Sequence, residues 1–474
     1  MKTPLNHLRS RPGHCSGIWP LLLLAIAYAA FFPASSAADQ PVRLNPRAVI
    51  VESFDGWGTS LCWWAHVLGG STNREAYADA AFQELQLNIV RYNIGGGENP
   101  AYPQNMETRA RLPGFEPQPG VWDWTADANQ RWFLRAAVAR GANQVVAFAN
   151  SPPYWMTVSG TVTGATNGAD NNLRPDREAA FAEYLVTVVR QLTVLDGVHF
   201  DLLTPMNEPA ANWWQAGNRQ EGDHMSPDQQ ARMINLLYPL LRQRGLAIGL
   251  EATEDNDEHH AVTSVKAYSA ATRKQLAWLA AHTYAANDPS GLRQLAETEH
   301  KPLWISEYGD GERDGLTFAR RIRDDLAQTH ARAWIYWQFA EPDSNWGLVR
   351  YHRGETNPAF KRTRKFFLLS GFTHAIRPGD QLLACSDPDS LVAYNRQTRR
   401  LSLVVVNDRD QPATKTFDLT AFGPTAAPAV GRRTSAREDL VGLPPQSVLS
   451  QQLTISLPAK SVTTWVLGGM VPTL

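Results

Sequence analysis

The middle of the chain alternates short apolar, β-branched runs with stretches whose apolar residues recur at helical spacing. Runs that are apolar along their whole length are typical of parallel strands buried on both faces. Helical patterns such as residues 177–192 and 229–244 separate them. Eight strand–helix units predict an α/β fold, a (β/α)8 TIM barrel, over residues 52–370. The expected strands are residues 53–58, 88–94, 144–149, 200–205, 247–251, 276–282, 302–307 and 333–339.

The pattern changes after residue 370. Short segments such as residues 401–406 and 461–467 follow one another, interrupted by turns rich in Pro, Gly and Asp. This texture predicts an appended β-sandwich domain over residues 371–474. Residues 39–51 are also β-prone, and we expect them to form an N-terminal strand that joins the sandwich.

The first 38 residues have the organisation of a signal peptide. Lys2, Arg9 and Arg11 precede an apolar stretch over residues 18–32, and a run of small residues over 34–38 follows. A membrane anchor is the alternative, but about 15 apolar residues is short of the roughly 20 that span a bilayer. We therefore expect cleavage near Ala38, no membrane association afterwards, and a secreted or periplasmic protein.

Composition narrows the function. Lys and Arg total 45 against 46 Asp and Glu, and no basic run stands out, so a nucleic-acid partner is not expected. Cys62 and Cys385 lie far apart in different predicted domains and imply no disulfide framework. No His-Glu-x-x-His or Cys-x-x-Cys pattern occurs, and we expect neither a cofactor nor a catalytic metal. A monomer is expected.

Two carboxylates follow predicted barrel strands, whose carboxyl ends carry the working groups in this architecture. Glu208 comes after the fourth strand in TPMNEP (residues 204–209), and Glu307 ends the seventh in LWISEYG (303–309). Glycoside cleavage needs one carboxylic acid to protonate the departing oxygen and one carboxylate to attack or to activate water. Taken singly, each motif also fits a helix-entry turn or a solvated strand end. As a pair on the fourth and seventh strands, they predict a glycoside hydrolase.

Further motifs make the sequence resemble glycoside hydrolase family 30 of clan A. These are GWGTSLCWWA (residues 56–65), NIGGG (93–97), SPPYWM (151–156) and IRPG (376–379). The resemblance covers nearly the whole mature chain. It implies a barrel with a side β-sandwich and a retaining mechanism, with Glu208 as acid/base and Glu307 as nucleophile. The form of the first motif most resembles the family's endo-β-1,6-galactanase branch, which acts on galactan side chains of arabinogalactan.

Other polar strand-end residues are candidates for holding the substrate or the nucleophile. We expect Glu307 to be ionised and held by Arg91 and Tyr284, with His282 buttressing Tyr284. In the resembling family, the position of Asn207 hydrogen-bonds the sugar 2-hydroxyl. The alternatives are a structural ion pair for Arg91 and a backbone cap for Asn207.

Tryptophans near predicted strand ends are candidate sugar platforms, and Trp337 and Trp155 are the preferred ones. Core packing is the alternative for each of them. The candidates are Trp63, Trp64, Trp155, Trp337 and Trp346.

An acidic run follows the fifth predicted strand, which ends at Glu251, a further candidate for binding substrate. The run lacks a regular ligand spacing, so a solvated loop is favoured over a cation site. It consists of Glu254, Asp255, Asp257 and Glu258.

Three rival functions stay open. Within the family, the substrate could be β-1,6-glucan or glucuronoxylan, since fold and catalytic pair would be shared. Arg350, His352 and Arg353 after the eighth strand could pair with a uronate carboxylate. From another class, the protein could bind carbohydrate without cleaving it, although the presence of both carboxylates counts against this.

Overall fold

The structure, a computed structural model, describes residues 40–101 and 105–473. The predicted signal peptide lies outside these residues. Among the described residues, no helix is long and apolar enough to cross a membrane. Cys62 and Cys385 are both free thiols.

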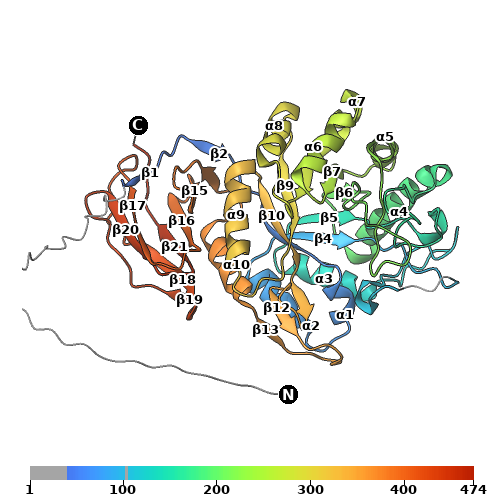
Figure 1. The fold of residues 1–474 in the computed structure, drawn as a ribbon, viewed down its shortest axis with the longest axis horizontal. Helices are drawn as coiled ribbons and strands as arrows, with labels where there is room; N and C mark the ends of the chain where they lie inside the picture. Colours follow the sequence, from blue (N-terminus) through green and yellow to red (C-terminus); the bar gives the residue numbers. More distant parts are fainter. Residues whose placement is uncertain (1–39, 102–104, 474) are drawn as a thin grey trace, which may run out of the picture. The chain divides into compact units, whose positions relative to one another are not determined.

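Eight parallel strands close into a barrel, which confirms the predicted fold class (Figure 1). The closing pair joins the last barrel strand to the first in parallel register. Most strands start within two residues of the prediction, but the first begins at Gly56. The preceding Asp55 carboxylate accepts hydrogen bonds from Trp304 and Arg332. The barrel strands are β3 (Gly56–Ser60), β4 (Ile89–Asn93), β5 (Gln144–Phe148), β6 (Leu202–Thr204), β7 (Gly249–Asp255), β8 (Leu276–His282), β9 (Leu303–Tyr308) and β10 (Ala333–Gln338).

Helices surround the barrel and bury its outer surface in one large apolar core (Figure 1). Their apolar faces recur at the spacing that the sequence shows, as in α4 and α5. The helices are α1 (Trp64–Leu68), α2 (Arg74–Ala78), α3 (Ala128–Ala139), α4 (Glu178–Asp196), α5 (Pro227–Gln243), α6 (Glu258–Ala267), α7 (Ala270–Gln275), α8 (Pro289–Glu299), α9 (Leu316–Thr329) and α10 (Arg364–Ala375).

A separate apolar cluster fills the inside of the barrel near the start of its strands. Ile89, Leu202 and Ala333 are the first residues of β4, β6 and β10, and Trp304 of β9 lies among them. Because these side chains occupy the amino-terminal end, polar groups that point inward gather at the carboxyl end.

Two further sheets lie outside the barrel, and most of their strands follow it in sequence. One has the strand order β19-β18-β21-β16-β15-β14-β2 and the other β1-β17-β20. The N-terminal strands take part in both, since β1 pairs with β17 and β2 pairs with β14. The strands are β1 (Val42–Arg43), β2 (Val49–Val51), β14 (Gln381–Leu383), β15 (Ser390–Asn395), β16 (Arg400–Asn407), β17 (Ala413–Asp418), β18 (Val430–Ser435), β19 (Glu438–Gly442), β20 (Gln452–Leu457) and β21 (Ser461–Leu467).

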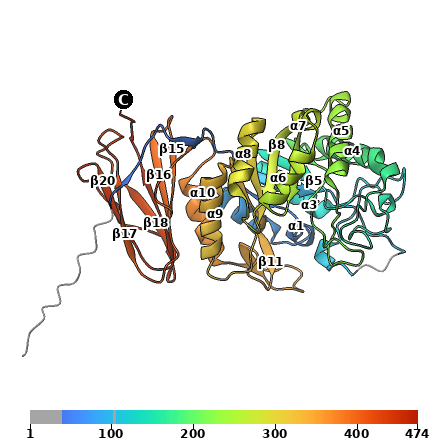
Figure 2. The same ribbon diagram turned by 45° about the horizontal axis from the view of Figure 1, so that its top comes forward.

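The middle of the larger sheet is buried on both faces. Leu403 and Val405 of β16 face the core between the two sheets, whereas Val404 and Val406 face the barrel core, as the two-residue period of a strand requires. Helix α10 packs on the barrel side against β16, β18, β19 and β21 (Figure 2). The predicted domain boundary after residue 370 falls inside this helix.

A small sheet follows the last barrel strand and borders the mouth of the barrel. It consists of β11 (Ala340–Pro342), β12 (Val349–Tyr351) and β13 (Phe360–Arg362).

Candidate active site

Five charged side chains from five segments of the barrel converge at its carboxyl end. Arg91 comes from β4, Glu254 from β7, His282 from the last position of β8 and Glu307 from β9, while Glu208 follows β6. All are at most 9% exposed. Their burial requires that each charge find a partner, and the contacts between them provide it.

Glu307 is held from two sides. Arg91 Nη1 donates to its Oε2 at 2.7 Å, and the Tyr284 hydroxyl donates to its Oε1 at 2.9 Å. These are the two partners expected from the sequence. Burial raises the pKa of Glu307, and the positive charges of His282 and Arg91 oppose that rise.

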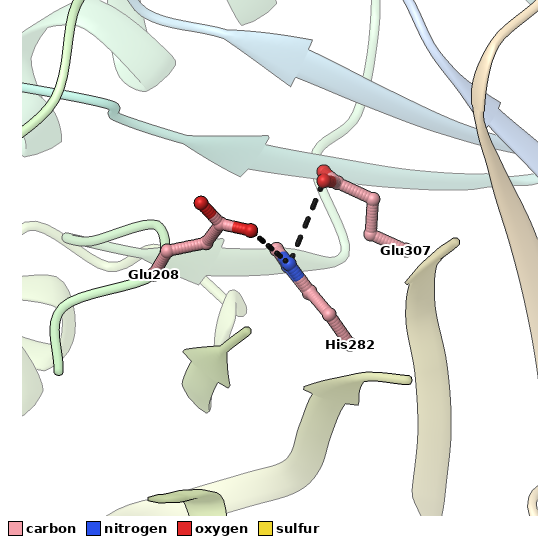
Figure 3. A group of neighbouring side chains, drawn as sticks. All are labelled: Glu208, His282 and Glu307. Atoms are coloured by element: carbon pink, nitrogen blue, oxygen red, sulfur yellow. Dashed lines mark hydrogen bonds and ion pairs between the residues drawn. The ribbon is translucent and has the colours of Figure 1, made fainter. Parts of the chain in front are cut away.

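Glu208 lies opposite Glu307 with His282 between them (Figure 3). One oxygen of each carboxylate and one ring nitrogen of His282 all lie within 4.8 Å of one another. Glu208 has a left-handed backbone, with φ of +50°, and its N–H donates to the carbonyl of Glu254 at 2.7 Å. A non-glycine residue rarely adopts this conformation, and such positions cluster at functional sites.

His282 contacts three carboxylates. Its Nδ1 lies 3.2 Å from Glu208 and 3.5 Å from Glu307, and its Nε2 lies 3.0 Å from Glu254. Burial alone lowers the pKa of His282, but the three carboxylates outweigh it and raise that pKa to about 10. The ring is therefore an imidazolium at neutral pH, a larger role than the expected support for Tyr284.

Glu254 anchors both cations from below, and the prediction of a solvated loop is wrong for it. Its Oε2 accepts from Arg91 at 2.7 Å, His282 at 3.0 Å and Ser306 at 2.9 Å. Burial opposes its ionisation, but the charge of Arg91 and the bond from His282 lower its pKa to about 2.

The rest of the acidic run is buried too, because β7 continues to Asp255 and α6 begins directly afterwards. Asp255 accepts from the backbone of Ala210, and Asp257 caps α6. Glu251 is 1% exposed, and burial together with the negative charge of the neighbouring Glu254 raises its pKa well above the usual value. It does not line the cleft, so the prediction that it contacts substrate is wrong.

Arg91 combines the two roles that the sequence left open. Its Nη1 also donates to Ser60, and its Nη2 donates to the side-chain oxygen of Asn207 at 3.1 Å as well as to Glu254. The guanidinium lies over the Phe148 ring, 4.2 Å from its centroid. It is both a buried ion-pair residue and a direct neighbour of Glu307.

A cleft of about 390 Å³ opens above these residues. Its walls contain seven of the residues predicted for the site, including three of the five tryptophans. These are Trp63, Asn207, Glu208, Tyr284, Glu307, Trp337 and Trp346. Trp63 and Trp337 meet edge to face, with ring centroids 5.2 Å apart.

Two predicted platforms do not line the cleft: Trp64 is buried in the core, and Trp155 is half-buried against it. Trp64 is 1% exposed, donates to the Ser60 carbonyl and packs against Phe133. Trp155 donates to the Glu116 carbonyl and packs against the barrel core. Indole rings bury well when the N–H finds one acceptor, and both do here.

Sequence reasoning missed a charged network in the cleft wall. Arg109 donates to Glu107 at 2.8 Å and to Glu341 at 2.5 Å, and it lies over the Trp63 ring. Arg353 also lines the cleft, whereas Arg350 lines a different groove. Nothing in the local pattern marks Glu107 or Arg109, since neither follows a barrel strand.

Within the part of the chain that the structure describes, Glu208, His282 and Glu307 also form the one group of three side chains close enough together to hold a metal ion. A metal would need an unprotonated ring nitrogen. The raised pKa of His282 favours the protonated ring, so this arrangement suits proton chemistry better than metal binding.

A model of the family described as O-Glycosyl hydrolase family 30 matches residues 51–297 of the 474 in this chain. The chain belongs to glycoside hydrolase family 30. It is therefore a glycosidase, and its substrate is a saccharide.

Two curated relatives of this family 30 protein carry activity names. An endo-beta-1,6-galactanase from Hypocrea rufa is 31% identical over 85% of this chain and 87% of its own length. An exo-beta-1,6-galactobiohydrolase from Bifidobacterium longum subsp. longum is 23% identical over 88% of this chain. The family 30 chain spans 38% of the length of that second protein.

Solved structures share the fold of this family 30 protein. A conserved exported protein from Bacteroides fragilis has a TM-score of 0.79 at 22% identity, covering 90% of this chain and 100% of its own. The subfamily 8 xylanase Xyn30A from Clostridium acetobutylicum has a TM-score of 0.71 at 20% identity, with the same coverage. These similarities establish the barrel with its side sheets and leave the substrate to other arguments.

Proposed function

We propose that this family 30 protein hydrolyses β-1,6-galactosidic linkages by a retaining double displacement, with Glu307 as nucleophile and Glu208 as acid/base. The observation that carries the mechanism is that one oxygen of Glu208 and one oxygen of Glu307 lie within 4.8 Å of each other, a short approach that favours the closer, retaining spacing. Retaining pairs lie about 5 to 5.5 Å apart, whereas inverting pairs leave room for water at roughly 6.5 to 9.5 Å. The curated relatives named for β-1,6-galactan cleavage support the linkage.

In the first step, Glu307 attacks the anomeric carbon, the bond to the departing oxygen breaks, and Glu208 gives that oxygen its proton. Oε1 of Glu208 forms a hydrogen bond with Nδ1 of His282, so we place the proton that is transferred on Oε2 of Glu208. Arg91 and Tyr284 hold the attacking carboxylate in place before the reaction. Glu307 becomes a neutral ester, and that side of the site loses one negative charge.

In the second step, Glu208 takes a proton from water, and the water oxygen attacks the anomeric carbon from the face that the first product left. The ester bond breaks and Glu307 recovers its negative charge, which the imidazolium of His282 stabilises. Arg91 fixes the side-chain oxygen of Asn207, which leaves the amide nitrogen for a sugar hydroxyl. A hydrogen bond from this amide to the sugar hydroxyl stabilises the transition state, in which positive charge develops on the sugar ring.

The substrate is tested by hydrolysis of β-1,6-galactan, β-1,6-glucan and glucuronoxylan, with product sizes resolved. We expect cleavage of the galactan with retention of the anomeric configuration. NMR of the first product formed measures that configuration. Failure on galactan with cleavage of another polymer would overturn the linkage. Since Arg353 lines the cleft, its replacement by Gln tests the uronate rival, which is removed if cleavage of glucuronoxylan does not change.

The tryptophans give a second prediction. Trp337→Ala is expected to raise KM on galacto-oligosaccharides about tenfold, or about 1.4 kcal/mol, because it removes an aromatic wall of the cleft. Trp155→Phe, the matched control, is expected to leave KM within twofold, since this half-buried ring packs against the core and does not line the cleft. Equal effects of the two substitutions on KM would contradict the assignment of Trp337 as a platform.

A further inference from the structure

A second concave surface, larger than the catalytic cleft, has a volume of about 520 Å³. We call it the basic groove. Segments of the barrel side line it, namely the loop before α9, strands β12 and β13 and the start of α10, together with residues around β19 and before β21. Six of its side chains are basic and two are acidic: Arg313, Arg350, Lys361, Arg362, Arg364 and Lys460 against Asp314 and Asp439.

Four of these cations lack a carboxylate partner. Arg313, Arg350 and Lys361 are exposed and make no ion pair with any residue that the structure describes. Arg364 donates to the backbone carbonyls of Ser435 and Ala436, which leaves its charge uncompensated. A concave wall of one sign concentrates oppositely charged ligands, so the groove attracts anions.

The basic groove and the catalytic cleft share a wall. Ser344 and Trp346 line the cleft, while Asn345 between them lines the groove. Lys365 of α10 is 1% exposed and its Nζ donates to the Asn345 carbonyl at 2.9 Å. The Tyr336 hydroxyl donates to the carbonyl of Trp346. These bonds hold the segment 344–346, whose residues face the cleft on one side and the groove on the other.

We propose that the basic groove binds carboxylate-bearing sugar units of a glycan whose neutral part occupies the catalytic cleft. The placement of the neutral part rests on the proposed function. Guanidinium groups match carboxylates with two parallel hydrogen bonds. Phe367 and Leu316 add apolar surface to the groove, which suits the C–H faces of a sugar ring better than a bare inorganic anion. Arg350, grouped with Arg353 by sequence, thereby acts outside the cleft.

The test is calorimetric titration of the wild-type chain with trigalacturonate. The triple variant Arg313→Gln, Arg350→Gln, Lys361→Gln is expected to bind at least about tenfold more weakly, and wild-type binding is expected to weaken with added salt. The matched control, Arg190→Gln, Arg396→Gln, Arg399→Gln, removes three exposed cations elsewhere and is expected to bind like wild type. Hydrolysis of neutral galactan and the melting temperature are expected to stay unchanged in both.

Three results would overturn the proposal: no binding of trigalacturonate to wild type, equal weakening in the control variant, or inorganic sulfate bound as tightly as the trisaccharide. The hydrolysis assay separates this proposal from the function itself. If neutral galactan is not cleaved but the groove variant alone loses trigalacturonate, the proposed linkage fails and the groove remains a uronate site.

Discussion

Glu307→Gln is expected to lower kcat on β-1,6-galactan by about 10⁴-fold or more, because an amide cannot form the glycosyl ester that splits the reaction into two steps. Glu208→Gln is expected to lower kcat by about 10² to 10⁴-fold, the range for removing one general acid. Both substitutions keep the size of the side chain, so the fold should survive. The measurement is kcat on the polymer, with the melting temperature as the folding control.

A substrate with a better leaving group distinguishes the acid/base role of Glu208 from the nucleophilic role of Glu307. With a dinitrophenyl galactoside, whose departure needs no proton, Glu208→Ala is expected to release one equivalent of phenolate in a rapid burst and then to slow. Glu307→Gln is expected to show no burst. Glu307→Gln within tenfold of wild type on galactan, or a burst from it, would contradict its role as nucleophile.

Glu254→Gln is expected to lower kcat by about 10²-fold while KM changes less than twofold, because Glu254 is fully buried and lies below the cleft. The substitution removes the shared anchor of Arg91 and His282, which both contact the Glu307 carboxylate. It also removes one of the three carboxylates that raise the pKa of His282. The imidazolium should therefore lose its proton at lower pH than in wild type.

The readout is the ¹⁵N shift of the His282 ring during a pH titration, assigned with His282→Gln. In wild type, we expect the ring to stay protonated through neutral pH and to titrate near the pKa of about 10, and in Glu254→Gln to titrate below it. Asp255→Asn is the matched control, since this acid ends the same strand and its carboxylate accepts from the backbone of Ala210 and contacts neither cation. Identical titrations in the Glu254 and Asp255 variants would exclude the anchoring role.

The sequence alone determined the barrel and the positions of its two catalytic candidates. Strands buried on both faces leave apolar runs that can be read locally, and every strand of a parallel barrel ends at the same mouth. Glu208 and Glu307 could therefore be placed together although about a hundred residues separate them. The family resemblance, carried by short motifs around those strand ends, pointed the same way.

Tertiary structure decided which neighbours of these residues belong to the site. Trp63 and Trp64 are adjacent in sequence, yet one faces the cleft and the other the core. Strand β7 extends past Glu251, and its pairing with β8 shifts register between Thr253 and Asp255, at Glu254 itself, which lies under Arg91 and His282. Hydrophobic periodicity is a property of a few consecutive residues, whereas the partner of a buried charge comes from a strand elsewhere in the chain. The strands could thus be predicted, and the contacts beneath the two carboxylates could not.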